Sequence, residues 1–355
     1  MPAADDRLWR HPSELGAATT RSRLDALRQS LGVAAASALG GGMIVAGLWL
    51  ALGSTGNPQL SSAFELDDEP PSSVLSPIRS IESTGRDGFA ATIVRIESTD
   101  GEATGVGFAL GDGLGVITGV DAVADMNTAT VLLPDGERVD ATVTGRDRLT
   151  GVAGLRLDSG SITAAPSGAD APVTVTGRVV AHTPDGTVAG ALSDAMVIVE
   201  TGGPWNHVVF ELRVEDPIAS GTPVVDAGGR LVGMVTDVDG VHADMTPIAV
   251  VRRVGSELLG SGSVSHPWLG VEARDATDGE VAGALVTLVE VDGPASDSGL
   301  TVDDIVTGVE GRSVTSIAEL INELRRHPVG HQVSIDVSGP NGTRTVQVEL
   351  GLLGG

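Results

Sequence analysis

A tight loop in the second half of the chain reads Asp216-Pro217-Ile218-Ala219-Ser220-Gly221-Thr222-Pro223. Around this loop, from Phe89 to about Gly260, short apolar runs rich in Val, Ile and Thr alternate with turns that contain Gly and Asp. No long helical period is apparent in this region. Regularly spaced short strands with turn signals are typical of a β-barrel or a β-sandwich. We therefore expect a mainly β domain that presents Ser220 on a loop.

The same region resembles the trypsin-like proteases of the HtrA (Deg) branch. The nucleophile loop of that branch reads N-P-G-N-S-G-G-P, so Ser220 matches the nucleophile. Gly105-Val106-Gly107-Phe108 matches the G-S-G-F opening, and Gly228–Met234 matches the segment after the serine strand. The resemblance implies a double β-barrel over residues 89–260 that carries a serine peptidase site.

The two other catalytic positions of the family carry different residues in this chain. The histidine loop usually reads V-T-N-A-H-V-V, and the matching segment 117–123 places Asp121 at the histidine. The aspartate segment usually reads T-D-L-A-V-L, and the matching segment 150–155 places Gly151 at the aspartate. A serine hydroxyl needs a positioned base, and a carboxylate with a pKa of ~3.9 is a far weaker base than histidine at ~6.5. The family's oxyanion-loop glycine is also replaced, by Ile218, so we expect no hydrolysis by the standard mechanism.

Several side chains remain candidates for a replacement base. Asp121 is one, although an aspartate in a turn usually bonds to its own backbone. The histidines of the barrel region are the others, namely His182, His207 and His242. An active serine endopeptidase with a non-standard base is therefore the alternative to an inactive homologue.

Composition and motifs argue against several other functions. The net charge of −25 opposes binding to nucleic acid, whose phosphates are also negative. The histidines are scattered singly and the chain has no cysteine, so no metal centre is predicted. No glycine-rich phosphate loop stands in the required context. We therefore expect neither a metal nor a cofactor.

From residue 266 to residue 352 the pattern resembles an HtrA-type PDZ domain. A helical stretch, Ser316–Arg326, precedes two strands that flank the hairpin signal Pro340-Asn341-Gly342. The resemblance assigns Trp268-Leu269-Gly270-Val271 to the loop that binds a peptide carboxylate, although these residues also suit an ordinary strand start. With the helix residues of the expected side-chain pocket, the predicted peptide-binding set is Trp268, Leu269, Gly270, Val271, Leu320, Ile321 and Leu324.

Residues 31–52 form an uncharged apolar run that is long enough to cross a bilayer, which takes ~20 residues. A cleaved signal peptide would have a shorter apolar region, of ~7–15 residues, so a retained anchor is favoured. Arginines precede the run and acidic residues follow it, which predicts a cytoplasmic N-terminus. Glycine spacings within the run leave a homo-oligomer open.

The remaining segments are predicted from composition. Residues 1–30 form a cytoplasmic tail in which Asp6–Gly16 resembles a short element of membrane-anchored actinobacterial proteins. Every basic residue is arginine, and Ala, Gly and Val are abundant, which indicates the GC-rich coding of actinobacteria. Residues 53–88 are rich in Ser, Pro, Gly and acids, which predicts an extracytoplasmic linker.

Together these features predict a single-pass, membrane-anchored HtrA-like pseudoprotease whose PDZ domain binds peptide C-termini of envelope proteins. It would act as a binding, scaffolding or regulatory module in the cell envelope. The alternative is an active serine endopeptidase that uses Ser220. A third possibility is a purely structural envelope component whose PDZ groove holds no peptide.

Overall fold

The computed structural model describes residues 89, 91–165, 177–199, 207–276, 281–340 and 342–353. The chain divides into two compact units, Met1–Ile81 and Glu82–Gly355, and all described residues lie in the second unit. The predicted tail and membrane segment, and the predicted linker up to residue 88, lie outside the described residues. Within the described ranges, no helix combines the length and the apolar character needed to cross a membrane.

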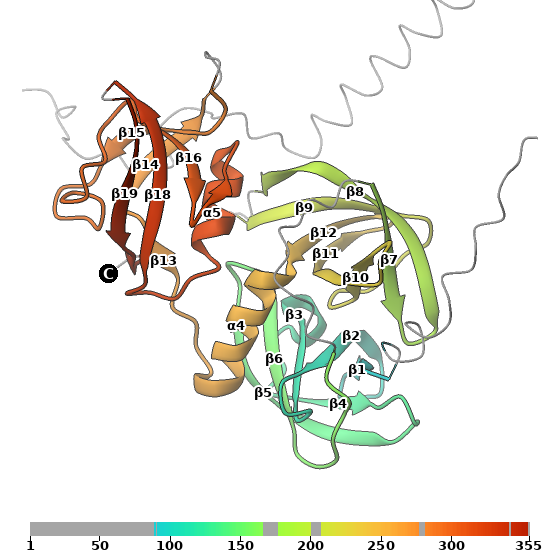
Figure 1. Cartoon of the computed structure of the whole chain (residues 1–355). Helices are drawn as coiled ribbons and strands as arrows, with labels where there is room; N and C mark the ends of the chain where they lie inside the picture. Colours follow the sequence, from blue (N-terminus) through green and yellow to red (C-terminus); the bar gives the residue numbers. More distant parts are fainter. Residues whose placement is uncertain are drawn as a thin grey trace, which may run out of the picture. The chain divides into compact units, whose positions relative to one another are not determined.

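The first barrel follows from strands in which alternate residues face the core. In β5, Val139 and Ala141 are buried while the residues on either side of them are exposed, the period expected of a strand with one buried face. The strands close in the order β1-β2-β3-β6-β5-β4 (Figure 1). They are β1 (Ile93–Glu97), β2 (Ala103–Leu110), β3 (Gly115–Gly119), β4 (Thr128–Leu132), β5 (Arg138–Asp147) and β6 (Val152–Leu157).

The second barrel repeats this topology. Its strands close in the order β10-β11-β12-β9-β8-β7, which, read in the opposite direction, is the order of the first barrel with six added to each strand number. The strands are β7 (Gly177–Thr183), β8 (Gly186–Val199), β9 (His207–Val214), β10 (Pro223–Asp226), β11 (Leu231–Asp239) and β12 (His242–Pro247). The mainly β double barrel predicted from the sequence is therefore confirmed.

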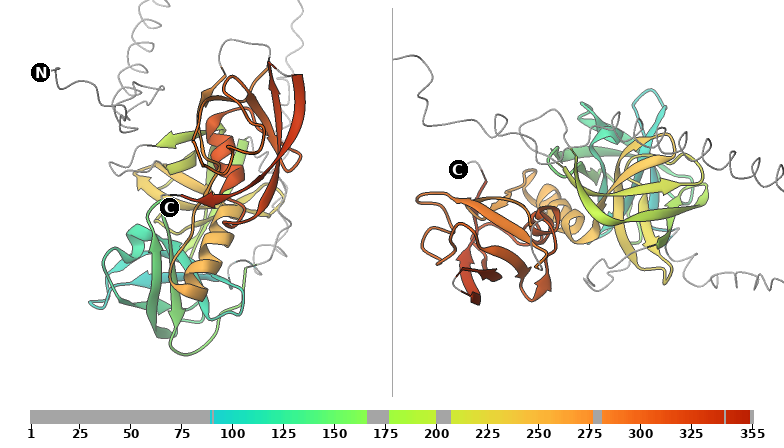
Figure 2. Two further views of the ribbon diagram at one scale, coloured as in Figure 1. Left: turned by 90° about the vertical axis from the view of Figure 1, so that its left-hand side faces the viewer. Right: turned by 90° about the horizontal axis from the view of Figure 1, so that it is seen from above.

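A helix that the sequence did not predict, α4 (Ile248–Ser261), follows the second barrel. Its buried residues recur every three or four positions, at Ile248, Val251, Val254 and Leu258, and so form one face. This face shares a core cluster with side chains of both barrels, and α4 runs along the strands in Figure 2. The prediction of a region without a long helix was wrong here because the valines of α4 resemble strand residues.

The C-terminal part is a small α+β domain built on an open sheet. The sheet has the order β14-β15-β16-β18-β19, with β17 paired to β16, and β13 pairs with β20 in a separate ribbon. The strands are β13 (Pro267–Trp268), β14 (Val271–Asp275), β15 (Ala284–Val289), β16 (Ile305–Val309), β17 (Arg312–Ser313), β18 (Gln332–Gly339), β19 (Gly342–Glu349) and β20 (Gly351–Leu352). One helix, α5 (Ile317–Leu324), packs on this sheet and begins at Ser316, whose hydroxyl accepts a bond from the Glu319 amide.

Candidate functional site

Ser220 lies between β9 and β10, and its side chain is buried, with 4% of the residue exposed. Its hydroxyl Oγ donates a long hydrogen bond of 3.3 Å to the Thr236 carbonyl oxygen on β11. The Ser220 carbonyl oxygen accepts a bond of 3.0 Å from the Val106 amide on β2. Both barrels therefore hold the serine, and its hydroxyl is directed into the protein.

Backbone fills the space on one side of the Ser220 hydroxyl. Gly119, the last residue of β3, lies so close that a Cβ atom at this position would overlap the Ser220 oxygen. The short helix α3 (Val120–Val123) begins directly after it and carries Asp121. The structure therefore brings the Asp121 segment and Ser220 together, as the resemblance implied.

Asp121 is exposed, and its pKa is raised above the usual value. The surrounding protein partly desolvates the carboxyl, and the charge of Asp237 raises the pKa further. His207 and Arg148 oppose these two effects. In the described part of the chain no hydrogen bond or ion pair joins Asp121 to Ser220. The carboxyl is thus a somewhat better base than a free aspartate, but it is not held on the serine.

Gly151 lies on the other side of the site, with φ at +72°. Its carbonyl oxygen accepts a bond of 2.9 Å from the Val120 amide, which ties it to the start of α3. A Cβ atom added to Gly151 would lie 2.7 Å from the Cβ atom of Thr236. The side chain of Thr236 therefore occupies the space into which an aspartate at position 151 would extend.

The Thr236 hydroxyl belongs to a small buried network. Its Oγ1 atom lies 3.2 Å from the Thr246 hydroxyl and 3.3 Å from the Asp244 carbonyl oxygen. The Thr246 hydroxyl in turn donates to the Thr150 carbonyl oxygen at 3.0 Å. Hydroxyl groups thus lie on the side of the site where the resemblance places a carboxylate. Sequence analysis had no signal for these contacts, because the contacting segments are distant in the chain.

Ile218 is buried and belongs to the core cluster of the second barrel. Next to it, a cleft of about 630 Å³ lies between the start of β2, the β7–β8 turn and residues 217–219. Its charged lining residues are Arg95 and Asp185, joined by contacts of 2.8 and 2.7 Å. The cleft beside the serine loop is otherwise lined by neutral side chains.

The barrel histidines do not contact Ser220 in the described part of the chain. A ring nitrogen of His207 contacts the Arg148 carbonyl oxygen, and His207 is close enough to Asp121 to affect its pKa. His182 is buried against Phe89, and His242 is exposed on β12. Among the described residues no group of three or more metal-ligating side chains is found.

The predicted carboxylate-binding residues lie on β13 and at the start of β14, in the C-terminal domain. Trp268 is half-buried on β13, Leu269 is buried in the domain core, and Val271 begins β14. Gly270 has φ at +81°, and a Cβ atom there would lie 2.7 Å from the Pro294 ring. The need for glycine at this position therefore already follows from packing within the domain.

The predicted helix residues point in two directions. Leu320 and Leu324 are buried in the core of the C-terminal domain, whereas Ile321 packs with Ala318 against the core cluster of the second barrel. The sequence stripe predicted one common face for these residues. Ile317, at the start of α5, and Ala273, on β14, are among the partly buried apolar residues that pack against the core of the C-terminal domain. The sequence could have predicted this position of Ala273, because Ala273 lies two residues after Val271 on the same strand and therefore faces the same side.

A buried histidine–aspartate contact joins the end of β5 to the start of the C-terminal domain. The His266 Nε2 atom lies 2.9 Å from Asp147 Oδ1, and Thr150 donates to Asp147 Oδ2 at 2.5 Å. Burial by itself raises the pKa of Asp147, but the bonds and charge of His266, with the bond from Thr150, outweigh it and hold the pKa below its usual value. Sequence analysis missed this pair.

Comparison with known families gives two matches. A trypsin-like peptidase domain matches residues 105–234, the range that holds Asp121, Gly151 and Ser220. A PDZ domain matches residues 267–350.

Several curated serine proteases are similar in sequence. A probable periplasmic DegP-like serine endoprotease of Brucella suis biovar 1 (strain 1330) is 25% identical over 268 residues, covering 70% of this chain and 52% of the relative. The serine protease PepD of Mycobacterium tuberculosis (strain ATCC 25618 / H37Rv) is 28% identical over 248 residues, covering 62% of this chain and 53% of the relative. The chain thus spans about half the length of these relatives.

Solved structures share the fold. The HtrA-type protease AlgW with a tripeptide has a TM-score of 0.56 at 24% identity, covering 76% of this chain and 97% of that one. AlgW with a decapeptide has a TM-score of 0.52 at 21% identity, covering 77% and 99%. The chain thus combines a region that matches a trypsin-like peptidase domain with a region that matches a PDZ domain, and it is similar in sequence to DegP-like serine endoproteases.

Proposed function

We propose that this chain is an HtrA-type pseudoprotease, and that its PDZ domain binds peptide C-termini. The observation that carries the proposal is the environment of Ser220. Its hydroxyl is buried and bonded to the Thr236 carbonyl, and Thr236 also occupies the space beside Gly151. A nucleophile needs a base on its hydroxyl and a group that orients the base, and this arrangement offers neither.

The size of the expected loss follows from the mechanism. Removing members of a Ser-His-Asp triad lowers turnover by ~10⁴ to 10⁶. The raised pKa of Asp121 recovers little of this, because the carboxyl is not bonded to Ser220 and a useful base must be within hydrogen-bond reach. The side chain of Ile218, buried in the second barrel, is also consistent with an altered oxyanion loop.

The PDZ part of the proposal rests on an open strand edge. In the described sheet β14 pairs with β15 alone, so its other edge can accept an extended peptide between β14 and α5. Backbone amides at Leu269, Gly270 and Val271 would receive the terminal carboxylate. The last side chain would then meet apolar groups of Val271 and Ile317, which favours ligands that end in a small or aliphatic residue.

We further propose an extracytoplasmic location with a single membrane anchor at residues 31–52. The apolar run and the arginine bias before it support this topology, and a DegP-like relative is named as periplasmic. In that location the chain would serve as a scaffold or regulator that holds the C-termini of envelope proteins. The proposal includes a homo-oligomer, which the glycine spacings within the apolar run would allow.

A second candidate is an active serine endopeptidase. The names of the relatives favour it, since both DegP-like proteins and PepD are named as serine proteases. The chemical observation in favour of activity is that His207 lies close enough to Asp121 to affect the pKa of the Asp121 carboxyl. Activity would then require the Ser220 hydroxyl to turn away from Thr236 toward one of these groups.

A covalent probe separates the two candidates. Full-length protein is treated with a fluorophosphonate, which labels activated serines, and compared with Ser220→Ala. We expect no labelling above the Ser220→Ala background and no cleavage of casein. Labelling that disappears in Ser220→Ala would refute the pseudoprotease and establish the second candidate.

A further inference from the structure

The strand β14 ends at Asp275, and the side chain of this residue reaches the helix on the other side of the proposed peptide groove. The Asp275 Oδ1 atom accepts a hydrogen bond of 2.7 Å from the amide of Ile317, the first residue of α5. A peptide strand in the groove would lie about 4.8 Å from β14. At Asp275 this space is already crossed by the carboxylate that joins β14 to α5.

The bonds at the two ends of β14 show which of its backbone groups face the open edge. Gly270 accepts a bond from the Glu290 amide, and the Ala276 amide donates to Gly283. The even-numbered positions therefore face the β15 segment. The register shifts at Thr287, which is an extra residue on β15, so β14 keeps its alternation. The backbone groups directed to the open edge are those of Val271, Ala273 and Asp275.

These three residues also share one side-chain face, because side chains alternate along a strand. Val271 and Ala273 pack against the core of the PDZ domain, as does Ile317 of α5. Asp275 is the charged member of the row and is exposed. The first two positions thus give the groove an apolar floor, and the third carries the carboxylate that bonds to α5.

Arg274 occupies the backbone of the same position. Its Nη1 atom donates to the Asp275 carbonyl oxygen at 3.2 Å, and this oxygen is one of the groups directed to the open edge. A strand that paired at Asp275 would have to displace this bond and the carboxylate bond to α5. Both bonds involve a charged group, and such bonds contribute more than a bond between neutral groups. Pairing at Asp275 is therefore disfavoured.

We propose that Asp275 ends the peptide groove, a conclusion that rests on the proposed binding of peptide C-termini. A ligand whose carboxylate lies at the start of β14 runs antiparallel to this strand, so its alternate residues pair with alternate residues of β14. Its last and third-last residues would pair with Val271 and Ala273. Its fifth-last residue would fall at Asp275. The groove would thus recognise the last three residues of a ligand, and a short tail on a folded protein would be sufficient.

Peptides of two lengths test this limit by isothermal titration of the full-length protein in detergent micelles. One is an acetylated tripeptide that ends in valine, and the other is an acetylated hexapeptide with three alanines before the same three residues. Both should bind the wild type with equal affinity, within about twofold. In Asp275→Ala the hexapeptide should bind about threefold to tenfold more tightly than the tripeptide, because one further backbone hydrogen bond can form.

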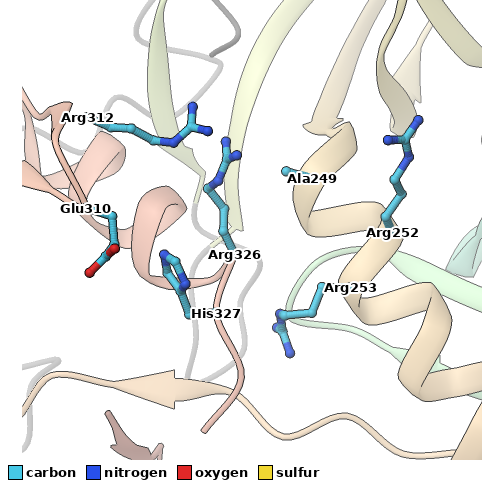
Figure 3. A pocket seen from close by; sticks show the side chains of 7 residues that line it. All are labelled: Ala249, Arg252, Arg253, Glu310, Arg312, Arg326 and His327. Atoms are coloured by element: carbon cyan, nitrogen blue, oxygen red, sulfur yellow. The ribbon is translucent and has the colours of Figure 1, made fainter. Parts of the chain in front are cut away.

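Two control variants separate this effect from a loss of charge or of a helix cap elsewhere. Asp275→Asn keeps a side-chain oxygen that can accept the Ile317 amide, so it should behave as the wild type does. Glu310→Ala also removes a carboxylate that accepts a backbone amide, that of Ser334 at 2.6 Å. Glu310 lines a cavity beside α4 whose lining includes no residue of β14 (Figure 3). Its removal should leave the effect of peptide length unchanged.

A wild-type preference for the hexapeptide as large as that of Asp275→Ala would overturn the proposal. So would a preference in Asp275→Asn equal to that in Asp275→Ala, since the bond to Ile317 would then be irrelevant. The amidated tripeptide separates this failure from a failure of the proposed function. Equal binding of the free and amidated tripeptides would refute carboxylate capture, and with it a groove that ends at Asp275.

Discussion

Gly151→Ala tests the observation that Thr236 fills the space next to position 151. A non-glycine residue at φ +72° costs roughly 1–2 kcal/mol on its own. The added Cβ would also lie 2.7 Å from Thr236 Cβ, and overpacking of this kind costs a further ~1–3 kcal/mol. We therefore expect the substitution to lower the free energy of unfolding by about 2–5 kcal/mol.

Gly136→Ala is the matched control. Gly136 has φ at +90° but no atom within 4 Å of an added Cβ, so it reports the backbone cost without the contact. Urea unfolding of both variants, followed by intrinsic fluorescence, gives the difference. In a Thr236→Gly background, which itself loses the hydroxyl bonds of Thr236, Gly151→Ala should cost no more than Gly136→Ala, because the opposing Cβ is then absent. The reasoning fails if Gly151→Ala and Gly136→Ala are equally destabilising.

The remaining predictions concern pH, peptide binding and topology. Because the pKa of Asp147 lies below its usual 3.8, its ionised form stabilises the fold above about pH 3.8, and this contribution is lost as the pH falls below that value. Asp147→Asn should thus lower the unfolding midpoint at pH 7 and reduce its fall in acid; parallel melting curves from pH 7 to pH 3 would contradict this. Peptides with a free aliphatic C-terminus should bind with affinities on the order of micromolar and their amidated forms should not, whereas equal titration curves would exclude carboxylate capture. Gly270→Val is unsuitable for that test because the new side chain would meet Pro294. Protease added to intact protoplasts should digest the chain after about residue 53 and spare the tail, and protection of the C-terminal domains would reverse the proposed orientation.

Local patterns were enough to predict a mainly β domain, and the resemblance to the HtrA branch narrowed this to a double β-barrel. Alternating burial in strands such as β5, and turn residues between short strands, indicate a β-barrel or a β-sandwich without reference to distant segments. The β18–β19 hairpin could also be predicted, because Pro340-Asn341-Gly342 is a strong hairpin signal. Gly342 adopts φ +84°, a conformation that favours glycine. Helix α4 was missed because its valines favour a strand locally, and only its packing against both barrels selects the helix.

The details of the site were not predictable in the same way. The segments that hold Asp121, Gly151 and Ser220 could be placed from the resemblance, and the structure brings them together. The filling of the Gly151 side by Thr236 depends on a contact between strands of different barrels. The inward direction of the Ser220 hydroxyl likewise depends on backbone geometry at Gly119. Neither contact can be predicted from a pattern in the local sequence.

The closed barrels affect how this chain can associate with other polypeptides. A closed barrel has no edge strand, so a stray extended segment cannot add to it. In the described part of the chain, the main sheet of the PDZ domain is open, and its two edge strands are β14 and β19. The β19 edge carries exposed polar residues on either side of its buried valines, namely Thr345, Gln347 and the charged Glu349, and such residues discourage pairing. Within this sheet strand addition is thereby directed to the β14 edge, so sheet extension through β19 is disfavoured while β14 stays available to a partner.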